Sequence, residues 1–360
     1  MRLQISNFRG IRKGSLELER LNILIGSNNS GKTTILEALF LAPNPIRYVA
    51  YGSGYDYSAV SVLSYLHSTL GSEAYVFLLH NYTERLAGIA CTDLSKEVKV
   101  WFQRGGNRIE VYVEENNELL YFGYLGSSNK SESILGSALL GQRDSESGRL
   151  MPGSRTRPIN PRYFISEATG ESFYFHPLLM KLIWGYLKDH WVEFRSKGLT
   201  SRVAKRISEG VAGDYDDLLL EPFIGGTQTI YVRTKDARGI RLGDLGSGVQ
   251  VLTTLMLIYE FLKPRMLLID DIESHMNPML LTHVVSWFAE ILKNDTMLVV
   301  STHSLEAAKF IAGALEEFEP QIVLLSLREG KLRSRNLSLD EVEELEKAGI
   351  DVRVGEGILI

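Results

Sequence analysis

Residues 26–33 carry the residue types that bind a polyphosphate. They read Gly26-Ser27-Asn28-Asn29-Ser30-Gly31-Lys32-Thr33, which fits the pattern G-x-x-x-x-G-K-[ST]. In such a loop the backbone N–H groups surround phosphate oxygens, the Lys32 ammonium reaches the β- and γ-phosphates, and the Thr33 hydroxyl ligates Mg²⁺. We therefore predict that these residues, together with the following Thr34, bind a nucleotide.

The chain around this loop predicts the elements that must position it. Leu21–Ile25 is an apolar run typical of a buried strand, and Thr34–Phe40 combines helical spacing with strong helix formers. A strand, a glycine loop and a helix in this order aim the positive end of the helix at an anion. The alternative is a glycine-rich surface turn, and the two flanking elements argue against it.

Two acids follow a second apolar run. Met266–Ile269 reads as a buried strand that ends in Asp270 and Asp271. A carboxylate at the C-terminal end of such a strand can hold Mg²⁺ beside a phosphate loop, and we give this role to Asp270. Asp271, or Glu273 two residues later, can accept a proton from an attacking water. Taken alone, the same acids could equally be solvated or cap a loop.

A third apolar run, Met297–Ser301, leads into Thr302, His303 and Ser304. A histidine at this strand end can donate a hydrogen bond to a terminal phosphate, because parallel strands end at the same edge of a sheet. The alternative is a helix-capping turn that contains an incidental histidine.

A glycine loop at residues 242–250 runs directly into another helical pattern. Ser247 and the N–H group of Gly248 can form a second anion-binding helix start, with Gly246 and Gln250 in the same stretch. This start is poorly placed to serve the first loop as well. The alternative is a turn that caps a core helix.

The order GSNNSGKT, LGSGVQ, LLIDD and THS resembles that of ABC-type ATPases, in particular the soluble branch with RecF, SMC-like and OLD-family heads. The opening MRLQISNFRGI resembles the start common in that branch. The segment from Leu339 to Arg353 resembles the tails of its stand-alone ATPases, which lack a Toprim domain. The likeness covers residues 1–42 and 228–353.

This resemblance implies a dimer bridged by ATP. Two heads would pair head to tail and enclose two ATP molecules with Mg²⁺, so that each phosphate loop faces Gly246, Ser247, Gly248 and Gln250 of the partner copy. Loss of the γ-phosphate removes a group that both copies hold, so hydrolysis would release the partners.

Two positions depart from the family pattern, and one further family residue has only a candidate here. Asp271 stands where the family has glutamate, and its shorter side chain predicts slow turnover, with Glu273 as a second candidate base. Asn277 replaces the histidine that precedes Pro278 in the family. A metal-sensing glutamine is expected between the first two motifs, and Gln103, at the end of a strand-like run, is the candidate.

The remaining pattern predicts an α/β fold with a mostly parallel sheet flanked by helices, and the resemblance implies that this fold is of the ABC-ATPase head type. Strand-like runs at 98–102, 109–113 and 119–122 predict an antiparallel β subdomain, residues 126–160 a mobile loop, and residues 177–220 a helical insertion. We divide the chain into head residues 1–45, an insertion at 46–220, head residues 221–330 with strands at 229–232 and 265–269, and a tail at 331–360.

Bulk properties exclude several protein classes. The chain has 360 residues, a formal net charge of -5 and a single cysteine, Cys91, so it has neither a disulfide framework nor a cysteine zinc cluster. No signal peptide is visible, and the longest apolar stretch, residues 249–262, is too short to cross a bilayer. We therefore expect a cytoplasmic protein that does not contact a membrane.

Two functions stay open at this point. The family likeness and a basic tract at residues 188–206 favour an ATPase of DNA repair, DNA maintenance or genome defence, although a solvated helix face explains that tract equally well. The alternative is an ATP-dependent regulatory switch or head subunit for a separate effector, such as a nuclease or toxin. The tail after His303 is too short to hold a nuclease domain, and GSGVQ in place of SGGQ argues against a transporter subunit.

Overall fold

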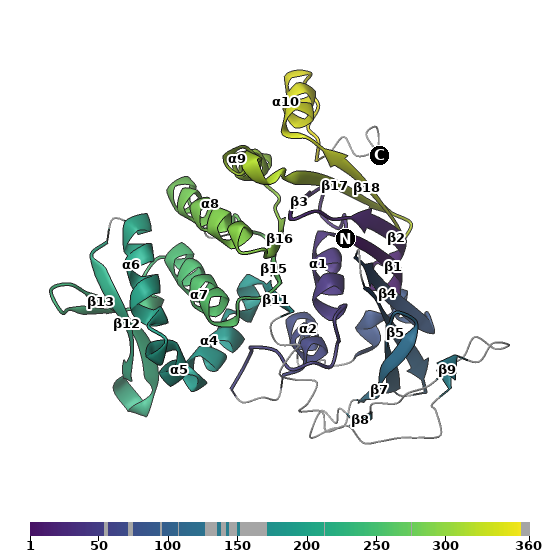
Figure 1. Cartoon of the computed structure of the whole chain (residues 1–360), viewed down its shortest axis with the longest axis horizontal. Coiled ribbons are helices and arrows are strands. Elements are labelled where there is room, and N and C mark those ends of the chain that lie inside the picture. The colour runs from purple at the N-terminus through teal and green to yellow at the C-terminus, as the bar shows by residue number, and fades with distance from the viewer. Residues whose placement is uncertain are drawn as a thin grey trace.

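The computed structural model describes residues 1–53, 57–70, 75–93, 96–106, 108–126, 135–137, 142–143, 150–151, 171–211, 213–274 and 276–353. The hydrophobic core of these residues is built on the two faces of one large mixed sheet (Figure 1). The loop predicted at residues 126–160 falls almost entirely outside these residues.

Five neighbouring strands of this sheet are parallel and form the part that carries the site. In spatial order they are β11 (Ser172–Phe175), β15 (Met266–Ile269), β16 (Met297–Ser301), β3 (Leu21–Ile25) and β17 (Gln321–Arg328). They are almost entirely buried, as continuous apolar runs in a doubly covered parallel sheet should be. The predicted fold class is confirmed.

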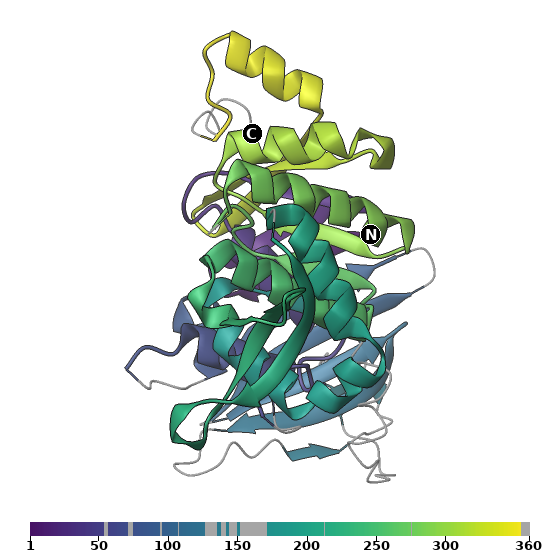
Figure 2. The ribbon, with the colours of Figure 1, turned by 90° about the vertical axis from the view of Figure 1, so that its left-hand side faces the viewer.

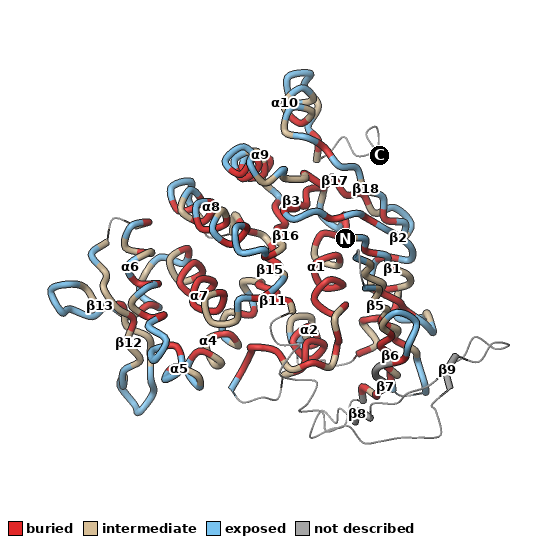
Figure 3. Tube along the Cα trace, in the orientation of Figure 1, coloured by how far each residue is buried: buried red, intermediate tan, exposed pale blue. Residues whose placement is uncertain are grey.

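Helices cover both faces of the parallel strands. On one face lie α1 (Lys32–Leu41) and α2 (Ala59–His67), and on the other lie α7 (Ser247–Leu262), α8 (Pro278–Lys293) and α9 (Leu305–Ala314) (Figure 1). Figure 3 shows exposed residues on the outward side of α8 and α9, whereas α1 has none and is buried along most of its length. Since α1 and α7 cover opposite faces, the phosphate loop and the glycine loop at 242–250 lead into different layers.

The rest of the sheet is mainly antiparallel and extends the parallel part without a break. After β17 come β18 (Lys331–Leu337), β2 (Ile11–Glu17), β1 (Arg2–Phe8), β4 (Leu86–Thr92), β5 (Glu97–Gly105), β6 (Arg108–Glu115), β7 (Glu118–Gly126) and β8 (Leu135–Ser137). The meander predicted from residue 98 onward is therefore antiparallel, but its strands pair through β4 with the N-terminal hairpin. The divisions at residues 45 and 220 do not mark separate sheets, because β11 also belongs to the central one.

A helical lobe and a small second sheet stand beside α7 and α8 (Figure 2). The lobe contains α4 (Met180–Asp189), α5 (Trp191–Ser196) and α6 (Leu199–Val211), and the sheet contains β12 (Tyr215–Pro222), β13 (Gln228–Thr234) and β14 (Gly239–Arg241).

Two predictions need correction here. The helical pattern expected up to residue 220 ends at Val211, and Leu218–Leu220 form a strand because they pair with β13. The strand predicted at residues 229–232 exists, but it lies in this small antiparallel sheet and not in the parallel one.

Candidate nucleotide site

The phosphate loop joins β3 to α1 in a conformation that requires its glycines. A Cβ atom on Gly26, whose φ is 146°, would lie 2.5 Å from the Leu325 carbonyl oxygen and 2.7 Å from Ser30 Oγ. Gly31, at the start of α1, has a φ of 100°, which only glycine adopts without strain. Asn28 and Asn29 between them are exposed. The loop backbone therefore turns toward solvent at the N-terminus of α1, where an anion binds.

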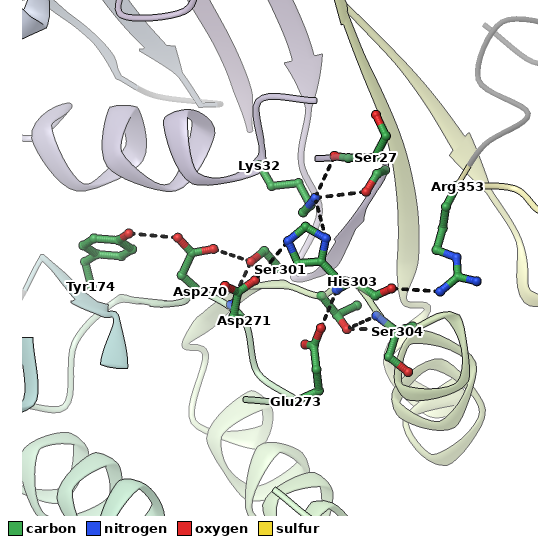
Figure 4. A network of polar contacts seen from close by, with 12 residues as sticks. Ser27, Lys32, Tyr174, Asp270, Asp271, Glu273, Ser301, His303, Ser304 and Arg353 are labelled. Carbon is green, nitrogen blue, oxygen red and sulfur yellow. Dashed lines mark hydrogen bonds and ion pairs between the residues drawn. The ribbon is translucent and has the colours of Figure 1, made fainter. Parts of the chain in front are cut away.

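Lys32 is held inside this loop. Its ammonium donates to the carbonyl oxygens of Gly26 (3.0 Å) and Ser27 (3.1 Å), and it lies 3.4 Å from Nδ1 of His303 (Figure 4). Because an ammonium only donates, we assign Nδ1 of His303 as the acceptor, and Nε2 then carries the ring proton. This brings the phosphate loop and the end of β16 into direct contact.

Asp270 lies at the end of β15 with both carboxylate oxygens engaged. Oδ2 accepts from the Tyr174 hydroxyl at 3.0 Å, and Oδ1 accepts from the Ser301 hydroxyl. Asp270 is only 1% exposed. Two donors fix this carboxylate in one orientation, and they come from β11 and β16, the strands on either side of β15.

Asp271 occupies a strained backbone conformation next to it. Its φ is 51°, and its N–H group donates to Ser301 Oγ at 2.9 Å. Its carboxylate lies 3.4 Å from Nε2 of His303. Burial, followed by the charge of Asp270, raises the pKa of Asp271 above its ordinary value. A raised pKa and a left-handed φ in a non-glycine residue are both typical of functional sites.

Glu273 binds the backbone of His303. Its Oε1 accepts from the backbone N–H group of His303 at 2.5 Å (Figure 4). Glu273 therefore holds the His303 backbone, whereas Asp271 faces the His303 ring. This difference favours Asp271 over Glu273 as the proton acceptor.

The residues present fit a magnesium ion that is shared with a nucleotide. Mg²⁺ in nucleotide sites takes one or two protein oxygens beside phosphate oxygens and water, and the Asp270 carboxylate and the Thr33 hydroxyl are oxygen ligands of this kind. Asp270 and the partly exposed Thr33 hydroxyl would hold it. The buried Ser30 hydroxyl has no hydrogen-bond partner in the described part of the chain, as expected for a group that contacts a ligand.

The glycine loop at 242–250 forms an exposed helix start. Gly246 precedes α7, and Ser247 at its first position is exposed. Nothing lies within 4 Å of a Cβ atom built on Gly246. The Gln250 amide closes the loop from within by donating to the carbonyl oxygens of Gly243 (3.2 Å) and Leu245 (2.8 Å).

Family profiles match both halves of the chain. The profile described as "AAA ATPase domain" matches residues 1–100, and the profile described as "AAA domain, putative AbiEii toxin, Type IV TA system" matches residues 142–308. The DNA replication and repair protein RecF of Pasteurella multocida is 31% identical over 127 residues, which is 34% of this chain and 30% of that protein.

Solved Smc heads share the fold. The Smc head domain of Pyrococcus furiosus, bound to the C-terminal domain of ScpA, has a TM-score of 0.52 at 13% identity over 96% of this chain and 98% of that chain. An SmcHead bound to the C-winged helix domain of ScpA has a TM-score of 0.51 at 13% identity over 95% and 98%. The chain therefore has the fold of an Smc head, and each of its halves is similar to an AAA ATPase domain profile. Its described residues contain no helix long and apolar enough to cross a membrane.

Gln103, the candidate metal-sensing glutamine, lies in the antiparallel part of the sheet. Gln103 lies on β5, opposite Leu86 and Glu110, and β5 is six strands away from β3 in the sheet order. The strand order does not support Gln103 as a metal ligand at the ends of β3 and β15, and that role stays a prediction. The sequence signal was only a glutamine at the end of a strand-like run, and the antiparallel pairing of that run placed it elsewhere.

Strand β11 is the neighbour of β15 on the side away from β16, and the residue that follows β11 is His176. This residue follows β11, and burial lowers its pKa, while the charges of Asp270 and Asp271 act in the opposite direction. Sequence analysis missed Tyr174 and His176 because β11 is only four residues long. The apolar run Phe173–Phe175 was its only signal.

Proposed function

We propose that two copies of this ATPase pair around ATP and separate after hydrolysis. One observation carries the proposal: Lys32, Asp270, Asp271 and His303 converge at one sheet edge, whereas Ser247 lies exposed at the start of a helix on the opposite face. A second anion-binding helix start that cannot serve its own phosphate loop suits the nucleotide of another copy.

Each residue at the sheet edge then has a role in hydrolysis. Lys32 binds the β- and γ-phosphates, Thr33 and Asp270 would hold Mg²⁺, and Asp271 accepts a proton from the attacking water. Bound Mg²⁺ would neutralise charge on the phosphates. The Nε2–H group of His303, which faces Asp271 in the structure, is the donor for the γ-phosphate.

Molecular mass in solution tests the pairing. We expect a monomer without nucleotide, a dimer with Mg²⁺ and a non-hydrolysable ATP analogue, and a return to monomer with ADP. A mass that is the same in all three conditions would contradict the proposal. Lys32→Ala serves as the control, because it removes the phosphate contact and should stay monomeric throughout.

We further propose that the dimer acts on DNA, in repair, maintenance or genome defence. The match to RecF, named as a DNA replication and repair protein, supports this. ATP hydrolysis measured with and without duplex DNA tests the proposal, and we expect stimulation that weakens as salt rises. An unchanged rate at low salt would argue against a DNA role.

Contacts of the basic tract at residues 188–206 with the neighbouring helices favour a second function. Arg202 on α6 pairs with Glu260 at 3.3 Å, Arg206 pairs with Glu290, and the Lys197 ammonium lies 4.4 Å from the centre of the Phe261 ring. All three cations contact α7 or α8, and the two arginines are paired with carboxylates, which offsets their charge toward DNA. The alternative is therefore an ATP-dependent switch for a separate effector protein, such as a nuclease or toxin. Lack of DNA stimulation, together with ATP-dependent dimers, would favour it.

A further inference from the structure

The segment that follows the last helix returns to the nucleotide site. Helix α10 (Leu339–Lys347) ends at a left-handed turn at Gly349, whose φ is 78°. The Ile350 N–H group closes the turn on the Leu345 carbonyl at 2.9 Å. Val352 is then completely buried in the main core. The tail is thus anchored by packing, and this anchor fixes where the next side chain lies.

That side chain is Arg353, and it binds the backbone of His303. Its Nη1 donates to the His303 carbonyl oxygen at 3.0 Å (Figure 4). Its Nε and Nη2 donate to the two carboxylate oxygens of Asp351 at 3.0 and 2.8 Å. A two-point contact with a carboxylate holds a guanidinium in one plane. Asp351 therefore orients Arg353, and Arg353 binds His303.

His303 is consequently fixed from both sides along its backbone. Glu273 accepts from its N–H group, and Arg353 donates to its carbonyl oxygen. Its ring lies between Lys32 and Asp271, although the side chain itself is 43% exposed. Since contacts to the ring are long, at 3.4 Å each, the backbone contacts are the closer ones, and they fix the position from which the ring extends toward Lys32 and Asp271.

We propose that Asp351 and Arg353 are positioning residues for ATP hydrolysis, which set the orientation of His303 toward the γ-phosphate. This inference rests on the proposed role of His303. It assigns a mechanistic task to the Asp351–Arg353 segment, which lies 48 residues or more beyond His303 in the sequence. It also makes the docking of α10 and its tail a condition for rapid turnover.

Steady-state kinetics of Arg353→Ala test the proposal. We expect kcat to fall about tenfold while KM for ATP and the affinity for a non-hydrolysable analogue stay within about twofold, because a misplaced group costs rate more than binding. Arg353→Lys should recover only part of kcat, since one ammonium cannot bind both Asp351 oxygens. Arg335→Ala, which removes another partly exposed tail arginine that pairs with Glu341, is the matched control and should keep wild-type kcat.

A double-mutant cycle separates positioning from a purely structural role. In a His303→Ala background, Arg353→Ala should cause no further loss of kcat, since the group that it positions is absent. Equal losses in both backgrounds would overturn the proposal, as would wild-type kcat in Arg353→Ala. If that variant does not fold, Asp351→Asn carries the same test. If His303→Ala itself keeps wild-type kcat, the proposed role of His303 fails first, which distinguishes the two failures.

Discussion

At the scale of single residues, the site is a chain of contacts in which each group has a defined partner. Tyr174 and Ser301 fix Asp270, Ser301 also accepts from the Asp271 backbone, and His303 bridges Asp271 to Lys32. The left-handed φ of Asp271 is tolerated because aspartate adopts this region more readily than most residues. The short carboxylate at this position therefore agrees with its backbone conformation.

The first prediction concerns the proton acceptor. Asp271→Asn should lower kcat by about 10²- to 10⁴-fold, since an amide cannot accept the proton from water, and it should trap a stable ATP-bound dimer. Single-turnover hydrolysis and mass in the presence of ATP measure both effects. Glu273→Gln is the matched control and should retain much more activity. The Glu273 carboxylate accepts from the His303 backbone N–H group, and the amide oxygen of glutamine can accept the same bond. Wild-type turnover in Asp271→Asn would show that the base is another group.

The second prediction concerns the support of the metal ligand. Tyr174→Phe removes one of the two hydroxyl groups that orient Asp270, so the Mg²⁺ concentration required for half-maximal hydrolysis should rise about 10- to 100-fold. The rate at saturating Mg²⁺ should change little. Tyr259→Phe removes a comparable buried hydroxyl bond, to Thr296 at 3.1 Å, and should leave the Mg²⁺ dependence unchanged. The same shift in both variants would speak against a specific role for Tyr174.

At the scale of elements, a buried polar cluster ties α1 to α2 and to the turn after β1. Glu37 on α1 is fully buried and pairs with Arg9, while Nε2 of His67 on α2 lies 2.5 Å from its carboxylate. Burial and the charge of Arg9 lower the pKa of His67 to about 3. A contact of 2.5 Å to a carboxylate also suits a charged imidazole, but burial and Arg9 both oppose a second positive charge here. We therefore treat His67 as neutral, with Nε2–H donating to Glu37 and Nδ1 facing Arg9.

This cluster predicts a pH dependence of stability. His67 has an ordinary pKa near 6.5 when unfolded, so its contribution is complete above about pH 6.5 and is lost as the pH falls toward about 3. Over that window the free energy of unfolding should decrease by at most about 1.4 kcal/mol per pH unit on account of this proton. Chemical unfolding at a series of pH values, compared between wild type and His67→Gln, measures the effect. Parallel curves for the two proteins would contradict it.

A substitution at the start of α7 should separate ATP binding by the monomer from ATP-dependent dimerisation. Ser247→Arg places a bulky cation on an exposed helix start with open space around Gly246, so it should cost at most about 1 kcal/mol of stability. ATP binding by the monomer should stay within about twofold, while the ATP-dependent dimer is lost. Isothermal titration and solution mass report the two properties. The smaller change Ser247→Ala should weaken the dimer without abolishing it.

At the scale of the whole molecule, head-to-tail pairing makes each site a product of two chains. Lys32→Ala and Ser247→Arg should each be inactive alone. In an equal mixture, only the mixed dimer contains one intact site, so activity should return, up to about half of the wild-type rate if the sites act independently. A mixture as inactive as its components would argue that each chain completes its own site or that both sites must be intact.

The sequence determined the local parts of this ATPase. The phosphate loop between its strand and helix, the acids after β15 and the histidine after β16 were all predicted. Each depends on a short run whose periodicity and turn chemistry are contained in neighbouring residues. Strands that end at one edge of a parallel sheet must bring their next residues together, so the convergence of Lys32, Asp270 and His303 also followed from the pattern.

Only the tertiary structure decided which distant segments join these parts. Pairing of β11 with β15 connects residues 172–175 to residues 266–269 and brings Tyr174 to Asp270, while pairing of β1 with β4 places Gln103 six strands from β3 in the sheet order. The contact of Arg353 with His303 likewise depends on where Val352 is buried. Such contacts arise from hydrogen bonding and burial between segments far apart in the chain. A local residue pattern specifies that a strand forms, but it does not specify the partner.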